Sequence, residues 1–597
     1  MSRNSNSIIT NVPTNRKPRT RIDMGVIDIL TSSQHGRLVP NFIAPVYPGD
    51  TWTNKDFAGF ARADKSLRVP LQNVEFDQYF FFVPFRIIDK NFEKVLGARD
   101  NPYDDNIYEM KQVKFDFSYS TEYSDSIATV SGIFASFLPS YLGWSAKDLS
   151  SLNDEQGTAA SDTYTAYPLM AYWKIYNDFF RDENLHASID LDTAITNISN
   201  ASIFDTIMSA WENDNQETEV VAALENLHLL PERVSRFHDL FSSGMITPQK
   251  SPDGQPVTLF LGGAAPLKVG DLYTLGGITG TNAGIKLDTA DGLSGGSGLG
   301  ITGTTKTVVS AGGVPTGTQA EITKTNLYAD LSEATAVDVN ALRLAFAIQS
   351  LYETKGRFGS RYIEYIRGIW SVSVPDAMLE RPEYLGGCHL TMNNMPIIDT
   401  ASQLGTFSGY SATLFDGANF DKTFLEYGYI IGVHCERIRH IMSQGLDTSI
   451  WRKRVELDLY NPKFAELGFM GYPKELSVHI PGADTNSEVF NYNEAWSLER
   501  ALLSRVSGIF SPLNGSSYQE FREKWTYVDY YDEVPSFNAN WLNEPTENVA
   551  RTLTGSVIAG ATNAISGHQY MFDFKFHFIV TRIIPVYSTP AELGGRW

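Results

Sequence analysis

Apolar and polar residues alternate strictly in one segment near the carboxyl end of the chain. Between Phe572 and Phe578, four phenylalanines alternate with Asp573, Lys575 and His577. Because successive side chains of a β-strand point to opposite faces, this pattern places four rings on one face and the polar groups on the other. The segment is therefore predicted to be a half-buried strand, with His577 as a solvated or interface histidine.

A second strand is predicted near the amino end, where residues 74–85 read VEFDQYFFFVPF. The pattern alternates at first and then becomes continuously apolar, as expected where a strand passes from a half-exposed to a fully buried setting. Pro84 has no amide hydrogen and limits how far this strand can pair with its neighbours.

Two segments in the middle of the chain show the spacing of amphipathic helices. In residues 168–181, large apolar side chains recur every three or four positions after a proline that suits a first helical turn. A second helix is predicted over residues 339–354, with Asp338 placed to cap its start and Gly356 just beyond its end. These helices do not alternate regularly with strands, which favours a mainly β core with long, partly helical insertions over a doubly wound α/β fold.

The composition changes between Leu275 and Gln319 to Gly, Thr, Ser and Ala, with almost no large apolar residues. Such a segment cannot build a core of its own, and we expect it to be the tip of an outward insertion that spans residues 255–335. Its glycines superficially resemble a phosphate-binding loop, but no apolar strand precedes them and no helix with a suitable lysine follows. A flexible loop is the preferred interpretation of Gly295, Gly296, Gly298, Gly300 and Gly303.

The overall charge argues against a broad nucleic-acid-binding surface. The 597 residues carry a formal net charge of −21 at pH 7, whereas phosphate binding needs concentrated lysine and arginine. A local exception is a polar, basic arm over residues 1–30, in which five cations precede the first acidic residue. These cations are Arg3, Arg16, Lys17, Arg19 and Arg21. The sequence leaves open whether the arm contacts nucleic acid or is a solvated or interface-clasping tail.

Candidate chemistry is sparse. The chain lacks an HExxH motif, a Walker A loop and a CxxC pair, so no cofactor and no enzyme activity are expected. His434, Cys435 and His440 offer metal-ligand atoms, but a zinc site would need a second ligand pair at close spacing. A core cysteine with surface histidines is the preferred interpretation. The adjacent carboxylates at positions 104–105 and 182–183 are interpreted as loop and helix-end charges rather than as a general acid and base.

Several segments, in chain order, match the pattern of one viral family. They are residues 33–50 (SQHGRLVPNFIAPVYPGD), 80–86 (FFFVPFR), 172–185 (YWKIYNDFFRDENL), 237–250 (FHDLFSSGMITPQK), 381–387 (RPEYLGG), 426–433 (EYGYIIGV) and 582–590 (RIIPVYSTP). Together they resemble the major capsid proteins of the Microviridae, specifically the gokushovirus-like branch of small icosahedral single-stranded DNA phages. The chain departs from the family pattern at residues 358–362 (FGSRY) and in its last seven residues, AELGGRW.

The resemblance implies a fold and a role. The fold is a mainly β, eight-stranded viral jelly roll over residues 31–597 with long loop and helical insertions. The role is that of a major capsid protein, present in the virion and assembled in the cytoplasm of a bacterial host. About sixty copies would form a T=1 icosahedral shell around a circular single-stranded DNA genome. Function would then reside in extended interfaces rather than in an active site.

The resemblance also implies partners and surfaces. Arg3, Arg16, Lys17, Arg19 and Arg21 would face the packaged DNA on the inner side of the shell. The glycine-rich insertion at 255–335, with Gly295 and its neighbours, would form a surface protrusion that faces the host receptor. A small basic DNA-packaging protein and a minor pilot protein are expected as further virion partners.

Two other classes of protein fit part of these features. A β-rich carbohydrate-binding protein or glycosidase would share the aromatic content, the acidic charge and a jelly roll, but it needs a cleft with paired carboxylates. An accessory virion protein, such as a spike or portal component, is the second alternative. The resemblance argues against it because the matching segments span most of the chain.

Overall fold

A computed structural model of the chain has two compact units. Unit 1 comprises Met1–Pro248 and Arg361–Trp597, and unit 2 comprises Gln249–Ser360. In unit 1 the structure describes, apart from a few isolated positions, residues 19–63, 74–98, 106–115, 136–144, 163–203, 217–248, 380–392, 394–399, 406–440, 445–477, 484–504, 537–544 and 568–584. In unit 2 it describes the strands and the helix named below.

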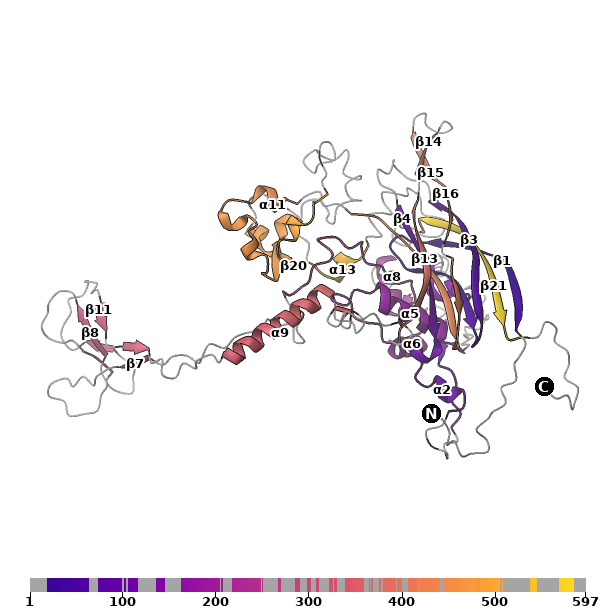
Figure 1. Cartoon of the computed structure of the whole chain (residues 1–597), viewed down its shortest axis with the longest axis horizontal. Helices are drawn as coiled ribbons and strands as arrows, with labels where there is room; N and C mark the ends of the chain where they lie inside the picture. Colours follow the sequence, from indigo (N-terminus) through magenta and orange to yellow (C-terminus); the bar gives the residue numbers. More distant parts are fainter. Residues whose placement is uncertain are drawn as a thin grey trace, which may run out of the picture. The chain divides into compact units, whose positions relative to one another are not determined.

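A five-stranded antiparallel sheet joins segments from both ends of the chain. Its strands run in the order β1 (Thr20–Ser33), β21 (Tyr570–Arg582), β3 (Thr51–Ala63) and β16 (Thr413–Asp416), and β17 (Asp421–Thr423) also pairs with β3. β21 lies between β1 and β3, so the strand predicted from alternating phenylalanines is central in its sheet (Figure 1). Residues 20–30 of the predicted arm at 1–30 belong to β1.

A four-stranded antiparallel sheet packs against the first. Its order is β13 (Glu383–Met392), β4 (Val74–Pro84), β18 (Gly428–Arg437) and β2 (Val39–Val46). The first four strands along the chain alternate between the two sheets, which is the connectivity of a jelly roll. The prediction of a mainly β, jelly-roll fold is confirmed. The predicted count of eight strands is not confirmed: among the described residues the two sheets contain five and four strands.

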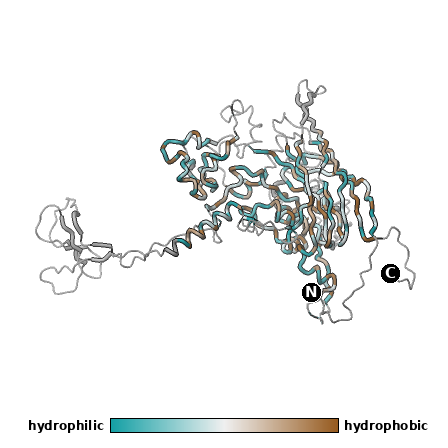
Figure 2. Tube along the Cα trace, viewed as in Figure 1, coloured by the Kyte–Doolittle hydropathy of each residue, from teal (hydrophilic) through white to brown (hydrophobic). Residues whose placement is uncertain are grey.

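Aromatic side chains fill the space between the two sheets. The inward rings of β21 at Phe572, Phe574, Phe576 and Phe578 are fully or almost fully buried, while the residues between them are half-buried or exposed. They pack with rings of β3 and β4, such as Phe57 and Phe76, and with Phe42 of β2. Figure 2 shows hydrophobic colouring gathered along these strands. Each buried ring contributes roughly 1.5–3 kcal/mol relative to an exposed one.

Helices cover the other face of the four-stranded sheet. The main one is α5 (Tyr167–Ile175), which continues as a π-helical turn through Tyr176–Phe180, so the predicted helix is confirmed. Its buried face packs against Phe81 and Val83 of β4 and against Ile431 and Val433 of β18. β4 and β18 are therefore covered on both faces, which explains their continuous apolar sequences.

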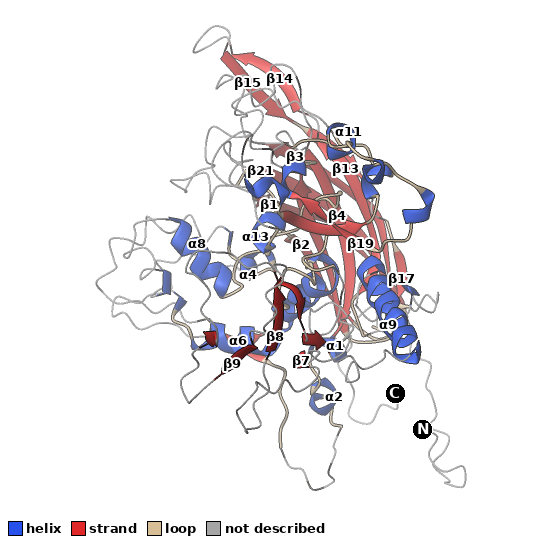
Figure 3. Cartoon of the chain, turned by 90° about the vertical axis from the view of Figure 1, so that its left-hand side faces the viewer, coloured by secondary structure: helices blue, strands red, loops and turns tan. Residues whose placement is uncertain are grey.

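Two long insertions separate the strands of the sandwich (Figure 3). Between β4 and β13 lie α1 (Phe85–Ile88), α2 (Phe92–Val95), β5 (Gln112–Lys114), α4 (Leu138–Tyr141), β6 (Thr163–Thr165), α5, α6 (Leu191–Asn200) and α8 (Glu217–Asn226). Between β18 and β21 lie α11 (Thr448–Trp451), β19 (Phe469–Pro473), β20 (Val489–Glu494) and α13 (Ala539–Leu542), with several short 3-10 turns. A hairpin of β14 (Asn394–Asp399) and β15 (Thr406–Ser411) precedes β16.

Unit 2 contains short strands and one helix. β7 (Leu267–Val269) pairs with β12 (Leu327–Ala329), and a second sheet has the order β10 (Val308–Ser310), β9 (Gly298–Ile301), β8 (Ile285–Thr289) and β11 (Ile322–Thr325). The prediction of a flexible loop is wrong for Gly298 and Gly300, which lie in β9. The predicted second helix is confirmed as α9 (Val339–Phe358), but it continues through Gly356. Among the described residues, no helix is long and apolar enough to cross a membrane.

Candidate functional site

The outer face of the five-stranded sheet carries two of the predicted DNA-facing cations. Arg21 lies in β1 opposite Thr581 of β21, Arg19 directly precedes β1, and both side chains are exposed. Arg582, at the end of β21, lies in the same region, where it pairs with Asp50 and packs over the ring of Tyr47. Arg3, Arg16 and Lys17 lie outside the described residues.

A row of polar side chains crosses the same face of the sheet. His577 of β21 lies between Asp23 of β1, at 2.8 Å, and Asp56 of β3, at 3.6 Å. The backbone amide of Gly25 and the ring of His577 together hold the pKa of Asp23 below its usual value. The predicted position of His577 on the polar face of its strand is confirmed. Exposed apolar residues of the same sheet include Val26 and Leu30 of β1 and Leu414 of β16.

A buried polar junction lies where β18 leaves the sandwich. The carboxylate oxygen Oε1 of Glu544 lies 3.0 Å from Nε2 of His35 and 2.9 Å from Nε2 of His440, and it accepts the backbone amide of Ile438 at 3.1 Å. All three charged or titratable side chains are essentially inaccessible to solvent. Burial alone would raise the pKa of Glu544, but His440 and His35 outweigh it and hold that pKa well below its usual range.

Local backbone geometry makes this junction possible. Gly36 has a φ of 74°, and a Cβ at this position would lie 2.9 Å from Cβ of Glu544, so only glycine fits without a shift. The amide of Gly36 donates to the carbonyl of Glu436, and its carbonyl accepts from Val234. The junction thus connects the segment after β1, the end of β18 and both insertions.

The three candidate metal ligands, His434, Cys435 and His440, do not form a metal site. His434 and Cys435 are neighbours on β18 and point to opposite faces of the sheet, one against Phe76 and Phe574 and the other toward the helices. The described residues contain no group of three or more side chains arranged to hold a metal ion. The buried cysteine was predicted correctly. The prediction of surface histidines is wrong, because His434 and His440 are both buried.

Burial shifts the acid–base behaviour of this strand. It lowers the pKa of His434 to about 3 and raises the pKa of the Cys435 thiol to about 12. It also raises the pKa of Glu436 to about 8, because the charged carboxylate is disfavoured away from water. Glu436 is therefore largely protonated at neutral pH.

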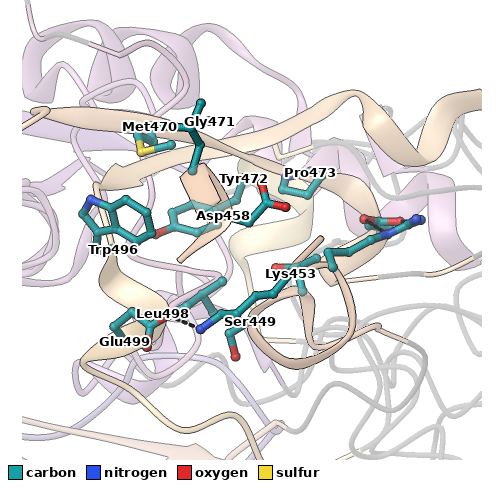
Figure 4. Close-up of a pocket in the computed structure, with 14 residues that line it drawn as sticks. Ser449, Lys453, Asp458, Met470, Gly471, Tyr472, Pro473, Trp496, Leu498 and Glu499 are labelled. Carbon is teal, nitrogen blue, oxygen red and sulfur yellow. Dashed lines mark hydrogen bonds and ion pairs between the residues drawn. The ribbon is translucent and has the colours of Figure 1, made fainter. Parts of the chain in front are cut away.

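A pocket of about 390 Å³ lies in the insertion between β18 and β21. Figure 4 shows Trp496 beside Tyr472, and Lys453 extended toward Glu499. Apolar side chains, including Leu457, Met470 and Leu498, form much of its lining, and Ser449 and Asp458 add polar groups. Trp496 has a φ of 62°, a left-handed conformation that is unusual for a residue with a large side chain.

The remaining predicted positions are distributed through the chain. Asp182 accepts the backbone amides of Asn184 and Leu185 just after the π-helical turn, as predicted for a helix-end charge. Gly298 and Gly300 lie in unit 2, whereas Gly295, Gly296 and Gly303 lie outside the described residues, as do positions 104–105. The geometry therefore shows an exposed sheet face, a pocket and a buried polar junction.

A family model described as "Capsid protein (F protein)" matches residues 10–592. The chain belongs to this family of phage capsid proteins. The match covers nearly the whole chain and agrees with the jelly-roll connectivity of the two sheets. The predicted capsid role is therefore confirmed: the protein is a structural component of the virion that associates with copies of itself in a shell.

Individual relatives of this capsid protein carry the same description. The chain is 28% identical over 570 residues to "Capsid protein VP1" of Spiroplasma virus 4, and the alignment covers 93% of this chain and 92% of that protein. It is 28% identical over 582 residues to VP1 of Bdellovibrio phage phiMH2K, and 27% identical over 602 residues to VP1 of Chlamydia phage 1, with the same coverage. The predicted resemblance to capsid proteins of the Microviridae is confirmed.

Sequence reasoning missed Glu544 altogether. It lies in the sequence NEPTEN, which has no pattern typical of a buried charge. His35 was noted only as part of the family segment 33–50 and His440 only as a metal candidate. Their common partner comes from a distant part of the chain, and no local signal could have revealed it.

Proposed function

We propose that this capsid protein assembles into a T=1 icosahedral shell of about sixty copies that encloses circular single-stranded DNA. Support comes from the family match over residues 10–592 together with the two-sheet jelly roll of unit 1. The match over nearly the whole chain carries the proposal, because a shared module alone would leave other virion roles open. We also propose that the protein has no catalytic activity.

The amino-terminal arm is proposed to contact the genome. Arg3, Arg16, Lys17, Arg19 and Arg21 would bind phosphates of the packaged strand on the inner face of the shell. The exposure of Arg19 and Arg21 at the start of β1 is compatible with this role. Replacing all five by alanine is expected to lower the DNA content per particle. A control variant, with Lys90, Lys355 and Arg357 of the insertion between β4 and β13 replaced by alanine, is expected to package normally. Normal DNA content in the five-alanine variant would contradict the proposal.

The insertion at 255–335, including Gly295, Gly296, Gly298, Gly300 and Gly303, is proposed to form a protrusion on the outside of the shell that meets the host receptor. The short strands of unit 2 would give such a protrusion a folded tip. Protease treatment of intact particles is expected to cut within 255–335 and to reduce adsorption to host cells. Resistance of this segment in particles that are otherwise intact would count against the placement.

Two further virion partners are proposed. With a net charge of −21, the subunit repels DNA overall, so a small basic packaging protein would help to neutralise the genome. A minor pilot protein is proposed by analogy with the family. Mass spectrometry of purified particles is expected to find both, and particles made of this chain and DNA alone would exclude them.

Electron microscopy tests the central proposal. The chain, produced in a bacterial host together with the other genes of its phage, is expected to form uniform shells of one small diameter. Monomers that bind or cleave glycans would instead support the carbohydrate-active alternative. Tubes or rings without closed shells would contradict icosahedral assembly.

A further inference from the structure

The insertion between β18 and β21 exposes an unusual number of large apolar side chains. Residues 450–470 form three short helical turns and the start of β19, and apolar side chains stand out from them into solvent. Trp451 is 71% exposed and Leu457 is 68% exposed, and Ile450, Val455, Leu459 and Leu467 are also more than half exposed. We call these six residues the 450–467 surface. Apolar groups gathered in this way mark an interaction site more often than a solvated surface.

The 450–467 surface is held in a fixed shape. Asp447 caps α11 by accepting the amide of Ser449, Asp458 accepts the amides of Arg454 and Val455, and Asn461 accepts the amide of Lys463. On its inner side, Tyr472, Leu476 and Phe490 pack with Trp541 and Leu542 of the same insertion and with Phe241 of the insertion between β4 and β13. The apolar side chains are thus presented by a rigid support, which lowers the entropic cost of binding.

Many charges around this surface are already paired within the insertion. Arg452 binds both carboxylate oxygens of Glu475, Lys453 lies 2.7 Å from Glu499, and Lys474 lies 2.6 Å from Glu488. A phosphate backbone would have to compete with these carboxylates for the same cations. The chemistry favours an apolar protein partner over nucleic acid.

The pocket described above opens beside the same surface and shares Leu457 with it. Met470, Trp496 and Leu498 form an apolar part of its wall, beside the charge pairs named above, and its volume is about 390 Å³. A hollow with an apolar part, next to protruding apolar groups, is an arrangement expected where two protein surfaces interlock.

We propose that the 450–467 surface and its pocket contact a second copy of this chain in the assembled shell. The inference rests on the proposed shell, because each subunit of a closed shell must bury part of its surface against its neighbours. This insertion offers a rigid apolar surface for that contact, and the charges around it are paired within the subunit. The pocket receives an apolar side chain of the neighbouring copy.

Footprinting of wild-type particles tests the contact directly. Hydroxyl-radical oxidation of Trp451 and Leu457 is expected to be slower in intact shells than in dissociated subunits by about fivefold or more, as for side chains that enter an interface core. Equal protection is expected in empty and DNA-filled shells. Unchanged oxidation in shells, or protection only when DNA is present, would overturn the proposal.

A pair of variants tests the same contact through assembly. The double variant Trp451→Glu and Leu457→Glu is expected to keep the thermal unfolding midpoint of the wild-type subunit but to form no shells. The control Ile107→Glu introduces a charge at a side chain that is 86% exposed in the insertion between β4 and β13. It measures how far an added surface charge by itself lowers the yield of shells. Normal shell yield from the double variant would overturn the inference. If the wild type forms shells in which Trp451 is not protected, this contact is refuted but the proposed shell is not. If the wild type forms no shells, both proposals are refuted.

Discussion

Glu544 is the residue on which the most distant segments of unit 1 converge. One of its carboxylate oxygens lies within 3.1 Å of three nitrogens, which belong to His35, Ile438 and His440. A neutral His35 that donates from Nε2 to this oxygen and accepts the hydroxyl proton of Tyr570 at Nδ1 satisfies both ring nitrogens. Because the site is buried, each of these interactions is stronger than it would be at the surface.

Replacing the charge of Glu544 is expected to destabilise the subunit. Glu544→Gln keeps the shape but removes the charged acceptor that both imidazoles face, and a hydrogen bond to a charged group contributes about 1.5–3 kcal/mol. The thermal unfolding midpoint of purified subunits measures the effect. The control Glu380→Gln alters an exposed carboxylate that lies 3.4 Å from Arg86, where a change of less than about 1 kcal/mol is expected. Equal midpoints for the two variants would show that the junction contributes little.

Glu436 gives the subunit a specific pH dependence. Its pKa is about 8 in the folded chain and about 4.5 when unfolded, so between these values the folded state binds more protons. Stability from this group is present below about pH 4.5 and is lost as pH rises to 8, by about 1.4 kcal/mol per pH unit. The variant Glu436→Gln is therefore expected to lose less of its unfolding midpoint than the wild type between pH 5 and pH 8. Parallel curves for the two proteins would contradict the buried, protonated state.

At the scale of elements, β21 shows how far local sequence can determine structure. Its alternation of phenylalanine and polar residues was enough to predict both the strand and its buried face. Successive residues of a strand point to opposite faces, so a shift by one position would expose every phenylalanine. The buried helix after residue 167 and the strand β4 were likewise predictable from periodicity. In each case the information lies within a dozen residues.

The wrong predictions concern residues whose burial or secondary structure is determined by tertiary contacts. His434 and His440 were predicted at the surface because the sequence around them is rich in charges. β18 lies between β4 and β2, with helices on one side and the second sheet on the other, and neither neighbour is visible from local sequence. The glycines of β9 illustrate the same limit, since pairing with β8 and β10 places them in a strand despite their weak propensity.

The inner and outer faces of β21 are expected to respond differently to truncation. Phe574→Ala removes a fully buried ring and should destabilise the subunit by about 3–5 kcal/mol. The neighbouring Lys575→Ala removes a half-exposed side chain that lies 3.9 Å from Asp28, and it should change stability by less than about 0.5 kcal/mol. Urea unfolding of the two variants gives the comparison. Similar losses from both would contradict the assignment of faces.

At the scale of the whole molecule, the three hydrophobic clusters formed by residues of described burial lie within unit 1. The helix-side cluster, the inter-sheet cluster and the small cluster around Phe490 and Trp541 draw all their residues from Met1–Pro248 and Arg361–Trp597. The folding of unit 1 is therefore expected to depend little on the insertion at 255–335.

Exchanging residues 255–335 for a short Gly/Ser linker tests this independence. The unfolding midpoint of the shortened subunit is expected to stay within about 2 °C of the wild type, which corresponds to roughly 2 kcal/mol in a chain of this size. Circular dichroism should show that the sheets are retained. A collapse of the midpoint would mean that the insertion contributes to the core of unit 1.

The central position of β21 has a consequence during synthesis. Contacts such as that between Asp23 and His577 span 554 positions, and β1 and β3 are joined into one sheet only by a strand translated much later. At about 5–20 residues per second, a ribosome needs roughly half a minute to two minutes to cover that distance. Throughout that interval the nascent chain carries two strands with one apolar face each, without the strand that unites them. Chaperones that bind extended apolar segments are therefore expected to accompany this polypeptide on the ribosome, and subunits from neighbouring ribosomes to remain apart until each chain has closed its own sheet.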